Sequence, residues 1–262
     1  MKQAMVIPFI CSLLFAGTAP VEMEWLDHTL NVTTNEQAHV TDILKIALST
    51  LQYDDSYAVG EIISQRPEIE NKIMKSIREK TMIKQHYLTD GSTEYLHVLP
   101  LTGEIMALLM PLQQPVQYVV PMLCPCCGQQ WPDAKSVPDD ITLVPKQTET
   151  SDFTGVVIDC RGKLLNPCLF PRIMTEQGKL VYSIDFALHH KVIDNGLVQY
   201  VTNEGSLVSR AGRNPLMLNA KEVTGSRSTI IIISDQDAIR VHGSKGIVQL
   251  LKECRVVILF GP

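Results

Sequence analysis

The chain has 262 residues, of which 45% are hydrophobic and 19% are charged. A chain of this length and composition can bury one large core or two small ones, which argues against wholesale disorder. Its formal net charge is -5 at pH 7, and no local cluster of Lys and Arg stands out. Nucleic acids are therefore not expected as partners, because their binding depends on neutralising phosphates.

Residues 1–19 have the pattern of a secretory signal peptide. Lys2 supplies a positive charge, residues 5–15 are almost wholly apolar, and residues 16–19 are small. The apolar run is too short to span a bilayer comfortably, and no later run approaches the roughly 20 residues of a transmembrane helix. We therefore expect an exported protein that is periplasmic or peripherally associated with the outer membrane. The alternative for this segment is an uncleaved N-terminal strand or a buried helix.

Residues 22–110 are predicted to form a compact α+β unit. A first strand is expected over residues 24–33, where apolar residues alternate loosely with polar ones. Apolar residues then recur at helical spacing over residues 40–51, which predicts a helix. Residues 57–64 are rich in residues that favour strands, so a second strand is expected there.

The rest of this unit carries three clearer signals. Pro67 is suited to the first turn of a second helix, whose apolar stripe begins at Ile69. Asp90 and Gly91 stand between two alternating runs, which predicts a hairpin over residues 81–101. A short helix over residues 103–110 completes the unit. The predicted arrangement has helices on one face of a mainly antiparallel sheet.

This order of elements resembles a known bacterial family. The resemblance covers residues 24–109 and includes Trp25 in the first strand and the hairpin sequence DGSTEYLHVLPLTGE. The unit resembles the compact domain of outer-membrane lipoproteins that include the flagellar accessory protein FlgP, and it is similar to the amino-terminal domain of FlgT. The resemblance implies a place in the envelope or the flagellum.

Residues 111–150 are predicted to be an extended linker, because prolines interrupt the segment repeatedly. The linker contains the sequence CPCCG at residues 124–128, which has the C-P-x-C-G form of a zinc knuckle. In such a turn Cys124 and Cys127 would direct two thiolates at one metal ion. A tetrahedral zinc ion needs two further ligands, and the sequence has no second C-x-x-C pair.

Three interpretations of the cysteines remain open at this stage. An exported protein with an even number of mature cysteines favours disulfides, a structural zinc site is the second option, and free or redox-active thiols are the third. Cys254 precedes a buried strand and is interpreted as a small core residue. The cysteines that could pair in disulfides are Cys124, Cys126, Cys127, Cys160 and Cys168.

Residues 151–262 are predicted to form a second small α+β unit with a mainly antiparallel sheet. Its first strand is the apolar run of residues 156–158, which ends at Asp159. A hairpin with Gly178 in its turn follows. Further strands are expected over residues 216–234, then a helix capped by Ser234 or Asp235 and a closing buried strand.

The second unit resembles a carboxy-terminal domain of exported bacterial proteins. The matching sequences, in this order, are TGVVIDCRG, NPCLFPRI, GRNPL and ECRVVILF. Proteins with this domain carry the FlgP- or FlgT-like unit ahead of it. The resemblance implies a periplasmic or outer-membrane-associated protein of envelope or flagellar assembly, with no assigned catalysis.

Other polar groups give weaker signals. Asp159 and Arg161 project from one side of a strand end, and either form a polar site with Arg172 or Arg213 or pair with each other to hold the loop that follows. The ion pair is preferred, because ion pairs at strand ends are common. His189 and His190 are adjacent and cannot share a helix face, so they are interpreted as surface residues. The sequence GSKG at residues 243–246 lacks the context of a phosphate loop.

The sequence therefore predicts a non-catalytic exported envelope protein, acting as an assembly or stabilising component of an outer-membrane or flagellar structure. Its expected partners are other envelope or flagellar proteins, or further copies of the chain. No cofactor is expected apart from the zinc option. The alternative function is a periplasmic metal-binding or thiol-redox protein that uses Cys124 and Cys127.

Overall fold

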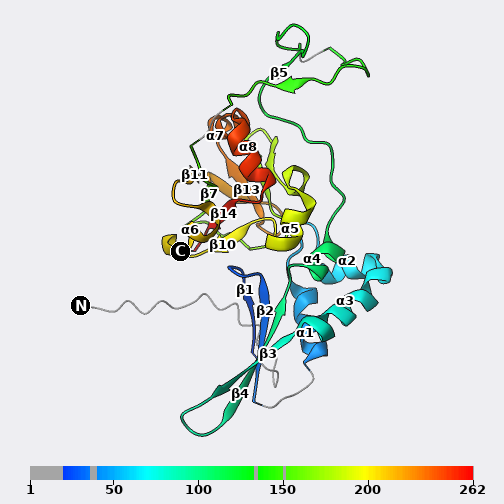
Figure 1. The fold of residues 1–262 in the computed structure, drawn as a ribbon, viewed down its shortest axis with the longest axis vertical. Helices are drawn as coiled ribbons and strands as arrows, with labels where there is room; N and C mark the ends of the chain where they lie inside the picture. The colour runs from blue at the N-terminus through cyan, green and yellow to red at the C-terminus, as the bar shows by residue number, and fades with distance from the viewer. Residues whose placement is uncertain (1–19, 36–39, 133–134, 150–151, 262) are drawn as a thin grey trace, which may run out of the picture.

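The computed structural model describes residues 20–35, 40–132, 135–149 and 152–261. The signal-peptide prediction for residues 1–19 lies outside these ranges. Within them the chain has the predicted mixed α+β fold. An N-terminal unit and a C-terminal unit lie against each other, and a long excursion of the chain separates them in sequence (Figure 1).

The N-terminal unit is built on one antiparallel sheet with the strand order β1-β2-β4-β3. Its elements are β1 (Val21–Glu24), β2 (Thr29–Thr34), α1 (Thr41–Thr50), α2 (Val59–Gln65), α3 (Pro67–Lys80), β3 (Met82–Tyr87), β4 (Thr93–Pro100) and α4 (Glu104–Leu109). The helices pack on one side of the sheet (Figure 1). The predicted helix from Pro67, the hairpin at Asp90 and Gly91, and the short helix that follows are all confirmed.

The segment over residues 57–64 was expected to be a strand and is instead largely helix α2. Its apolar residues Val59, Ile62 and Ile63 are buried together at the spacing of a helix face. The Glu61 carboxylate accepts a hydrogen bond of 2.6 Å from the backbone amide at the helix start, which satisfies one free donor there. Packing and capping therefore override the strand preference of this short run.

The first predicted strand is also different, because residues 24–33 belong to a hairpin. Strands β1 and β2 pair in register from Val21 with Val32 to Glu24 with Thr29. His28 lies in their turn with φ of 53°, a region that residues other than glycine seldom adopt. The tight turn places the His28 side chain against the C-terminal unit.

The predicted linker is extended, with one two-residue pairing between β5 (Met122–Leu123) and β6 (Val144–Pro145). The β5–β6 excursion projects from the body of the molecule (Figure 1). Its base is fixed to the C-terminal unit, where the Val119 amide donates to Nδ1 of His242 at 3.0 Å. The other ring nitrogen therefore carries the proton, and it donates to the Val181 carbonyl at 2.8 Å.

The C-terminal unit contains two four-stranded sheets, with strand orders β10-β14-β7-β11 and β12-β13-β8-β9. Its strands are β7 (Val156–Asp159), β8 (Arg172–Thr175), β9 (Leu180–Tyr182), β10 (Gln199–Val201), β11 (Leu216–Asn219), β12 (Glu222–Thr224), β13 (Ile230–Ile233) and β14 (Val256–Leu259). Its helices are η1 (Ile184–Phe186), α5 (His189–Asn195), η2 (Glu204–Ser206), α6 (Val208–Ala211), α7 (Asp235–His242) and α8 (Lys245–Lys252). The predicted hairpin around Gly178 and the cap at Ser234 are confirmed.

The strand directions of this unit differ from the antiparallel expectation. Strand β7 pairs in parallel with both β14 and β11, and β14 pairs in parallel with β10. The central strands are apolar and buried along nearly their whole length, as is usual for parallel sheets covered on both faces. Helical segments connect these strands, and such crossovers permit parallel pairing where short turns do not.

The two units share a single core. One cluster of buried apolar residues runs from Leu30 and Leu44 in the N-terminal unit to Val156 and Ile258 in the C-terminal unit. A second joint lies at Asp55, whose carboxylate accepts hydrogen bonds from residues 226–229 of the loop between β12 and β13. The units are therefore fixed to each other by direct packing rather than by the linker.

Candidate functional site

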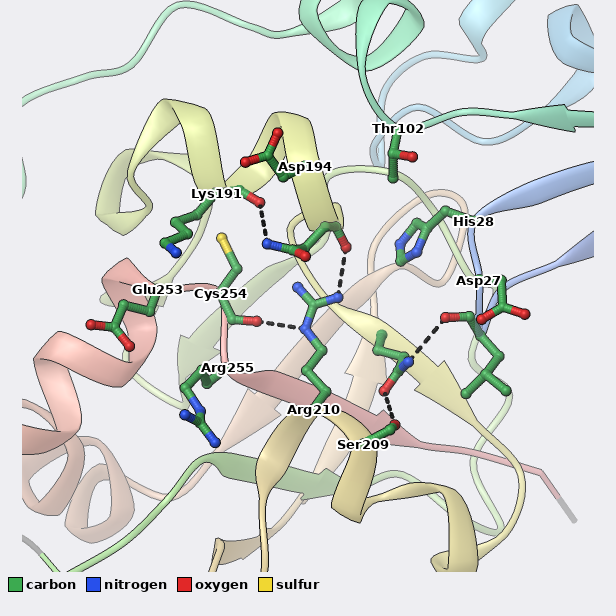
Figure 2. Close-up of a pocket in the computed structure, with 13 residues that line it drawn as sticks. Asp27, His28, Thr102, Lys191, Asp194, Ser209, Arg210, Glu253, Cys254 and Arg255 are labelled. Carbon is green, nitrogen blue, oxygen red and sulfur yellow. Dashed lines mark hydrogen bonds between the residues drawn. The ribbon is translucent and has the colours of Figure 1, made fainter. Parts of the chain in front are cut away.

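A cleft of about 470 Å³ lies at the junction of the two units. The β1–β2 turn borders it on one side, and α5, α6 and the loop before β14 border it on the other (Figure 2). Its lining is mostly polar and includes Asp27, His28, Asp194, Arg210 and Glu253. A cleft with convergent polar groups is the usual first candidate for a binding or active site.

Arg210 is the buried cation of the cleft, and its guanidinium is engaged by main-chain oxygens. Its Nε donates to the Cys254 carbonyl at 2.5 Å, Nη1 to Asn195 at 2.8 Å, and Nη2 to Gly196 at 2.6 Å. Figure 2 shows the side chain directed from α6 into these carbonyls. Burial lowers the pKa of Arg210. The side chain closes the carboxyl end of α5, where free carbonyls attract a cation.

His28 faces the same region and is neutral. Burial lowers its pKa to about 4, and the positive charge of Arg210 acts in the same direction. A hydrogen bond to the Val198 backbone opposes this shift. The ring lies so close to Gly196 that a side chain at that position would overlap it. The histidine therefore fills space at the joint between the two units.

The remaining polar contacts also hold the joint together. Gln199 donates to the Leu26 carbonyl at 2.9 Å and accepts from the Ser209 hydroxyl at 3.3 Å. Burial raises the pKa of the Cys254 thiol, which keeps it protonated and a poor nucleophile. The Nε atom of Arg255 is buried without a hydrogen-bond partner among the described residues. Of these groups, Gln199 makes the hydrogen bond that joins the two units.

The CPCCG turn follows β5 directly, and the chain then returns beside β5 with a bridge between Leu123 and Gln130. The Gly128 amide donates to the Cys124 carbonyl at 2.9 Å, and the Cys124 amide donates to the Gln129 carbonyl at 2.9 Å. The nearby backbone amides of Cys127 and Cys126 lower the pKa of the Cys124 thiol. Cys126 and Cys127 are exposed. The turn therefore has the backbone geometry that favours a thiolate.

The other cysteines are enclosed. Burial raises the pKa of the Cys160 and Cys168 thiols to about 12, and Cys168 lies against the Tyr200 hydroxyl. Cys254 is fully buried, in agreement with its interpretation as a core residue. All six cysteines of the described segments are free thiols. Within those segments, no three His, Cys, Asp or Glu side chains gather as a metal-binding group. The assignment of Cys124 and Cys127 to a metal stays a prediction.

The charged pair at the end of β7 is present. Arg161 binds the Asp159 carboxylate through Nη2 at 2.6 Å, and its Nη1 reaches Glu204 at 3.1 Å. Hydrogen bonds from Arg161 lower the pKa of Asp159. Among the described residues no ion pair joins this group to Arg172 or Arg213. The following loop is held instead by main-chain bonds, such as that from the Leu169 amide to the Gln52 carbonyl at 3.0 Å.

The weaker candidates have structural positions. His189 and His190 are both exposed on α5. In the GSKG segment, the Ser244 side chain accepts from the Ile247 amide and caps α8. The Gly243 carbonyl accepts from the Thr148 amide at 2.8 Å, which fastens the end of the linker. These contacts account for both groups without a ligand.

Sequence reasoning did not identify Asp55, Arg210 or His242 as important. Each is an ordinary polar residue in the sequence. The partners of Asp55 lie 171 to 174 positions away, and His242 binds a linker residue 123 positions away. No local pattern signals such contacts.

Comparison with known proteins relates one segment of the chain to a described family. Residues 155–262 match the family model for the second domain of Treponema pallidum Tp0624. The Tp0624-like segment begins one residue before β7 and includes both sheets of the C-terminal unit. A search of curated proteins finds no match. None of the helices in the described residues is long and apolar enough to cross a bilayer.

Proposed function

We propose that this chain is a non-catalytic exported envelope protein that assembles or stabilises an outer-membrane or flagellar structure by binding another envelope protein. The observation that carries the proposal is the projecting β3–β4 hairpin. All six residues of β3 are exposed, and β3 is the edge strand of its sheet. The hairpin extends beyond the helices of the N-terminal unit (Figure 1).

An exposed edge strand is a ready site for pairing with another protein, because its outer row of amides and carbonyls lacks a neighbouring strand. The β3 edge also carries apolar side chains in solvent. Ile83 is 49% exposed and Tyr87 is 79% exposed, and the two share one face of the strand. Large apolar groups in such a position favour a partner that covers them.

The junction cleft supports the same interpretation. Gln199 binds a main-chain carbonyl of the N-terminal unit and His28 packs against Gly196 of the C-terminal unit, so the cleft contributes rigidity. Arg210 binds main-chain carbonyls within the C-terminal unit. The resemblance of residues 24–109 to FlgP- and FlgT-like domains and the signal-peptide pattern suggest the location. The Tp0624-like segment extends the relationship to a domain of another bacterial protein.

The proposal is tested by complementation of a deletion strain with variants of the hairpin. The Ile83→Lys/Tyr87→Glu double variant changes one face of β3, and His86→Lys changes the other face as a matched control. Both sites are exposed, so both proteins should fold and reach the envelope fraction at the parental level. We expect the double variant to lose envelope integrity or motility and the control to restore it.

Any of three results would overturn the proposal. One is recovery of the protein in the cytoplasm after fractionation. The others are a deletion strain whose envelope and motility are unchanged, and full complementation by the double variant.

A further inference from the structure

The CPCCG turn has the backbone arrangement of one half of a metal site. The Gly128 amide donates to the Cys124 carbonyl at 2.9 Å, and the Cys124 amide donates to the Gln129 carbonyl at 2.9 Å, so the chain folds back over the two cysteines. Gly128 follows with φ of 69°, a conformation that suits glycine and permits the chain to reverse after the fourth residue of the turn. The paired strands β5 and β6 fix the base of this turn.

Within the described ranges, no other side chains complete this half-site. A structural zinc ion takes four ligands in a tetrahedron, and the turn supplies two at the C-x-x-C spacing. Of the remaining described thiols, Cys126 is an exposed residue of the same turn, and Cys160, Cys168 and Cys254 are buried in the C-terminal unit. Across the described ranges no larger group of metal-binding side chains forms. Because the described residues supply only these two ligands at the turn, a second copy of the chain is a natural source of the other two.

We propose that Cys124 and Cys127 of two copies of this chain bind one zinc ion between them. Two identical turns related by a twofold axis supply four sulfur ligands, which is a complete tetrahedral site for zinc. Cys127 is exposed, Cys124 is partly exposed, and the turn lies on an excursion that projects from the body of the molecule (Figure 1).

Cys126 serves as an internal control for this assignment. It is exposed and adjacent to both proposed ligands, but it occupies the third position of the turn. In a C-P-x-C-G turn that position contributes its amide to the first sulfur and not a thiolate to the metal. A Cys126→Ser variant keeps this amide and should keep the site.

The test measures metal content and mass of the full chain after purification in reductant with zinc present. We expect about 0.5 zinc ions per chain and a dimer by light scattering, on the ligand count above. A strong chelator should convert the dimer to a monomer. The Cys124→Ser and Cys127→Ser variants should be monomeric without zinc, whereas Cys126→Ser should match the parent.

Cobalt provides a second measurement. Cobalt(II) in place of zinc should give the absorption of a tetrahedral tetrathiolate site in the parent and in Cys126→Ser, but not in the other two variants. Each of four results would overturn the proposal. They are one zinc ion per monomer, a dimer that survives chelation, the absence of zinc, and loss of the site in Cys126→Ser. None of these results depends on the hairpin experiments, so the two proposals fail separately.

Discussion

Asp55 is the residue whose replacement should most clearly separate the two units. Its side chain is 9% exposed and accepts four hydrogen bonds from the loop between β12 and β13. The amides of Ser226 and Arg227 donate at 2.9 and 3.0 Å, and the hydroxyls of Ser226 and Thr229 donate at 3.2 Å. All four donors belong to the other unit.

The Asp55→Ala variant removes every one of these acceptors. Each donor that is left buried without a partner costs about 1 to 3 kcal/mol, although water can reach some of them in the enlarged space. We expect a loss of about 3 kcal/mol in the free energy of unfolding. Asp55→Asn keeps one oxygen and should lose about 2 kcal/mol, because hydrogen bonds to a charged acceptor are the stronger ones.

The assay is urea unfolding followed by circular dichroism and by tryptophan fluorescence. Trp25 packs against Tyr200 with ring centroids 5.2 Å apart, so its emission reports the contact between units. The matched control is Asp54→Asn, because Asp54 binds only amides of its own turn and asparagine can replace it there. An Asp55→Ala protein within about 0.5 kcal/mol of this control would refute the reasoning.

The same residue predicts a pH dependence with a definite sign. Burial acts to raise the pKa of Asp55, but the amides and hydroxyls that it binds outweigh this effect, so the net pKa is lowered from 3.8. A carboxylate with a lowered pKa stabilises the folded state fully above its unfolded pKa. This contribution should disappear as the pH falls below 3.8 and through the lowered pKa, and Asp55→Asn should lack it.

Three further predictions concern the interior. Burial lowers the pKa of His242 to about 4, so between pH 7 and pH 4.5 the parent should lose about 2 kcal/mol more than His242→Gln in urea titrations; parallel curves would contradict this. Arg210→Met leaves three carbonyls without their donor and should lower the melting temperature by about 10 °C in calorimetry, with a change under about 3 °C as the contrary result. Gly155→Ala places a Cβ 2.5 Å from the Ala211 backbone and should cost about 2 kcal/mol or more in urea unfolding; parental stability would contradict the close approach.

The parts of the fold that the sequence predicted well are those with strong local signals. Helix α3 has a proline at its start and a buried face at helical spacing, and the β3–β4 hairpin has Asp90 and Gly91 in its turn. Both signals act over fewer than about 15 residues, which is the range over which periodicity and turn chemistry decide a structure. These elements needed no knowledge of the rest of the chain.

The errors occur where distant contacts decide the outcome. Helix α2 is a short apolar run, and its helical form depends on packing against α1 and on the Glu61 cap. Whether β7 is parallel or antiparallel to its neighbours depends on β11 and β14, which follow it in the sequence after long helical connections. A buried strand has the same apolar composition in either direction, so its local sequence does not distinguish parallel from antiparallel pairing.

The candidate sites divide in the same way. The CPCCG turn is a local motif, and both its prediction and its observed turn follow from five consecutive residues. The junction cleft brings together His28, Arg210 and Cys254 from remote parts of the sequence. None of the three stands in a recognisable motif, so the joint could be found only from the fold.

The two proposed sites lie at opposite ends of a body whose polar groups are largely satisfied internally. Asp55 and Gln199 fasten the N-terminal unit to the C-terminal unit, and His242 fastens the linker to the same C-terminal unit. A metal-bridged pair of chains would therefore hold two β3–β4 hairpins at a fixed separation, with the bodies acting as rigid spacers. When one hairpin of the pair binds an envelope assembly, the metal bridge would raise the effective concentration of the second hairpin at the same assembly and so strengthen the attachment. On this argument, loss of zinc should weaken attachment to the envelope without changing the fold of either unit.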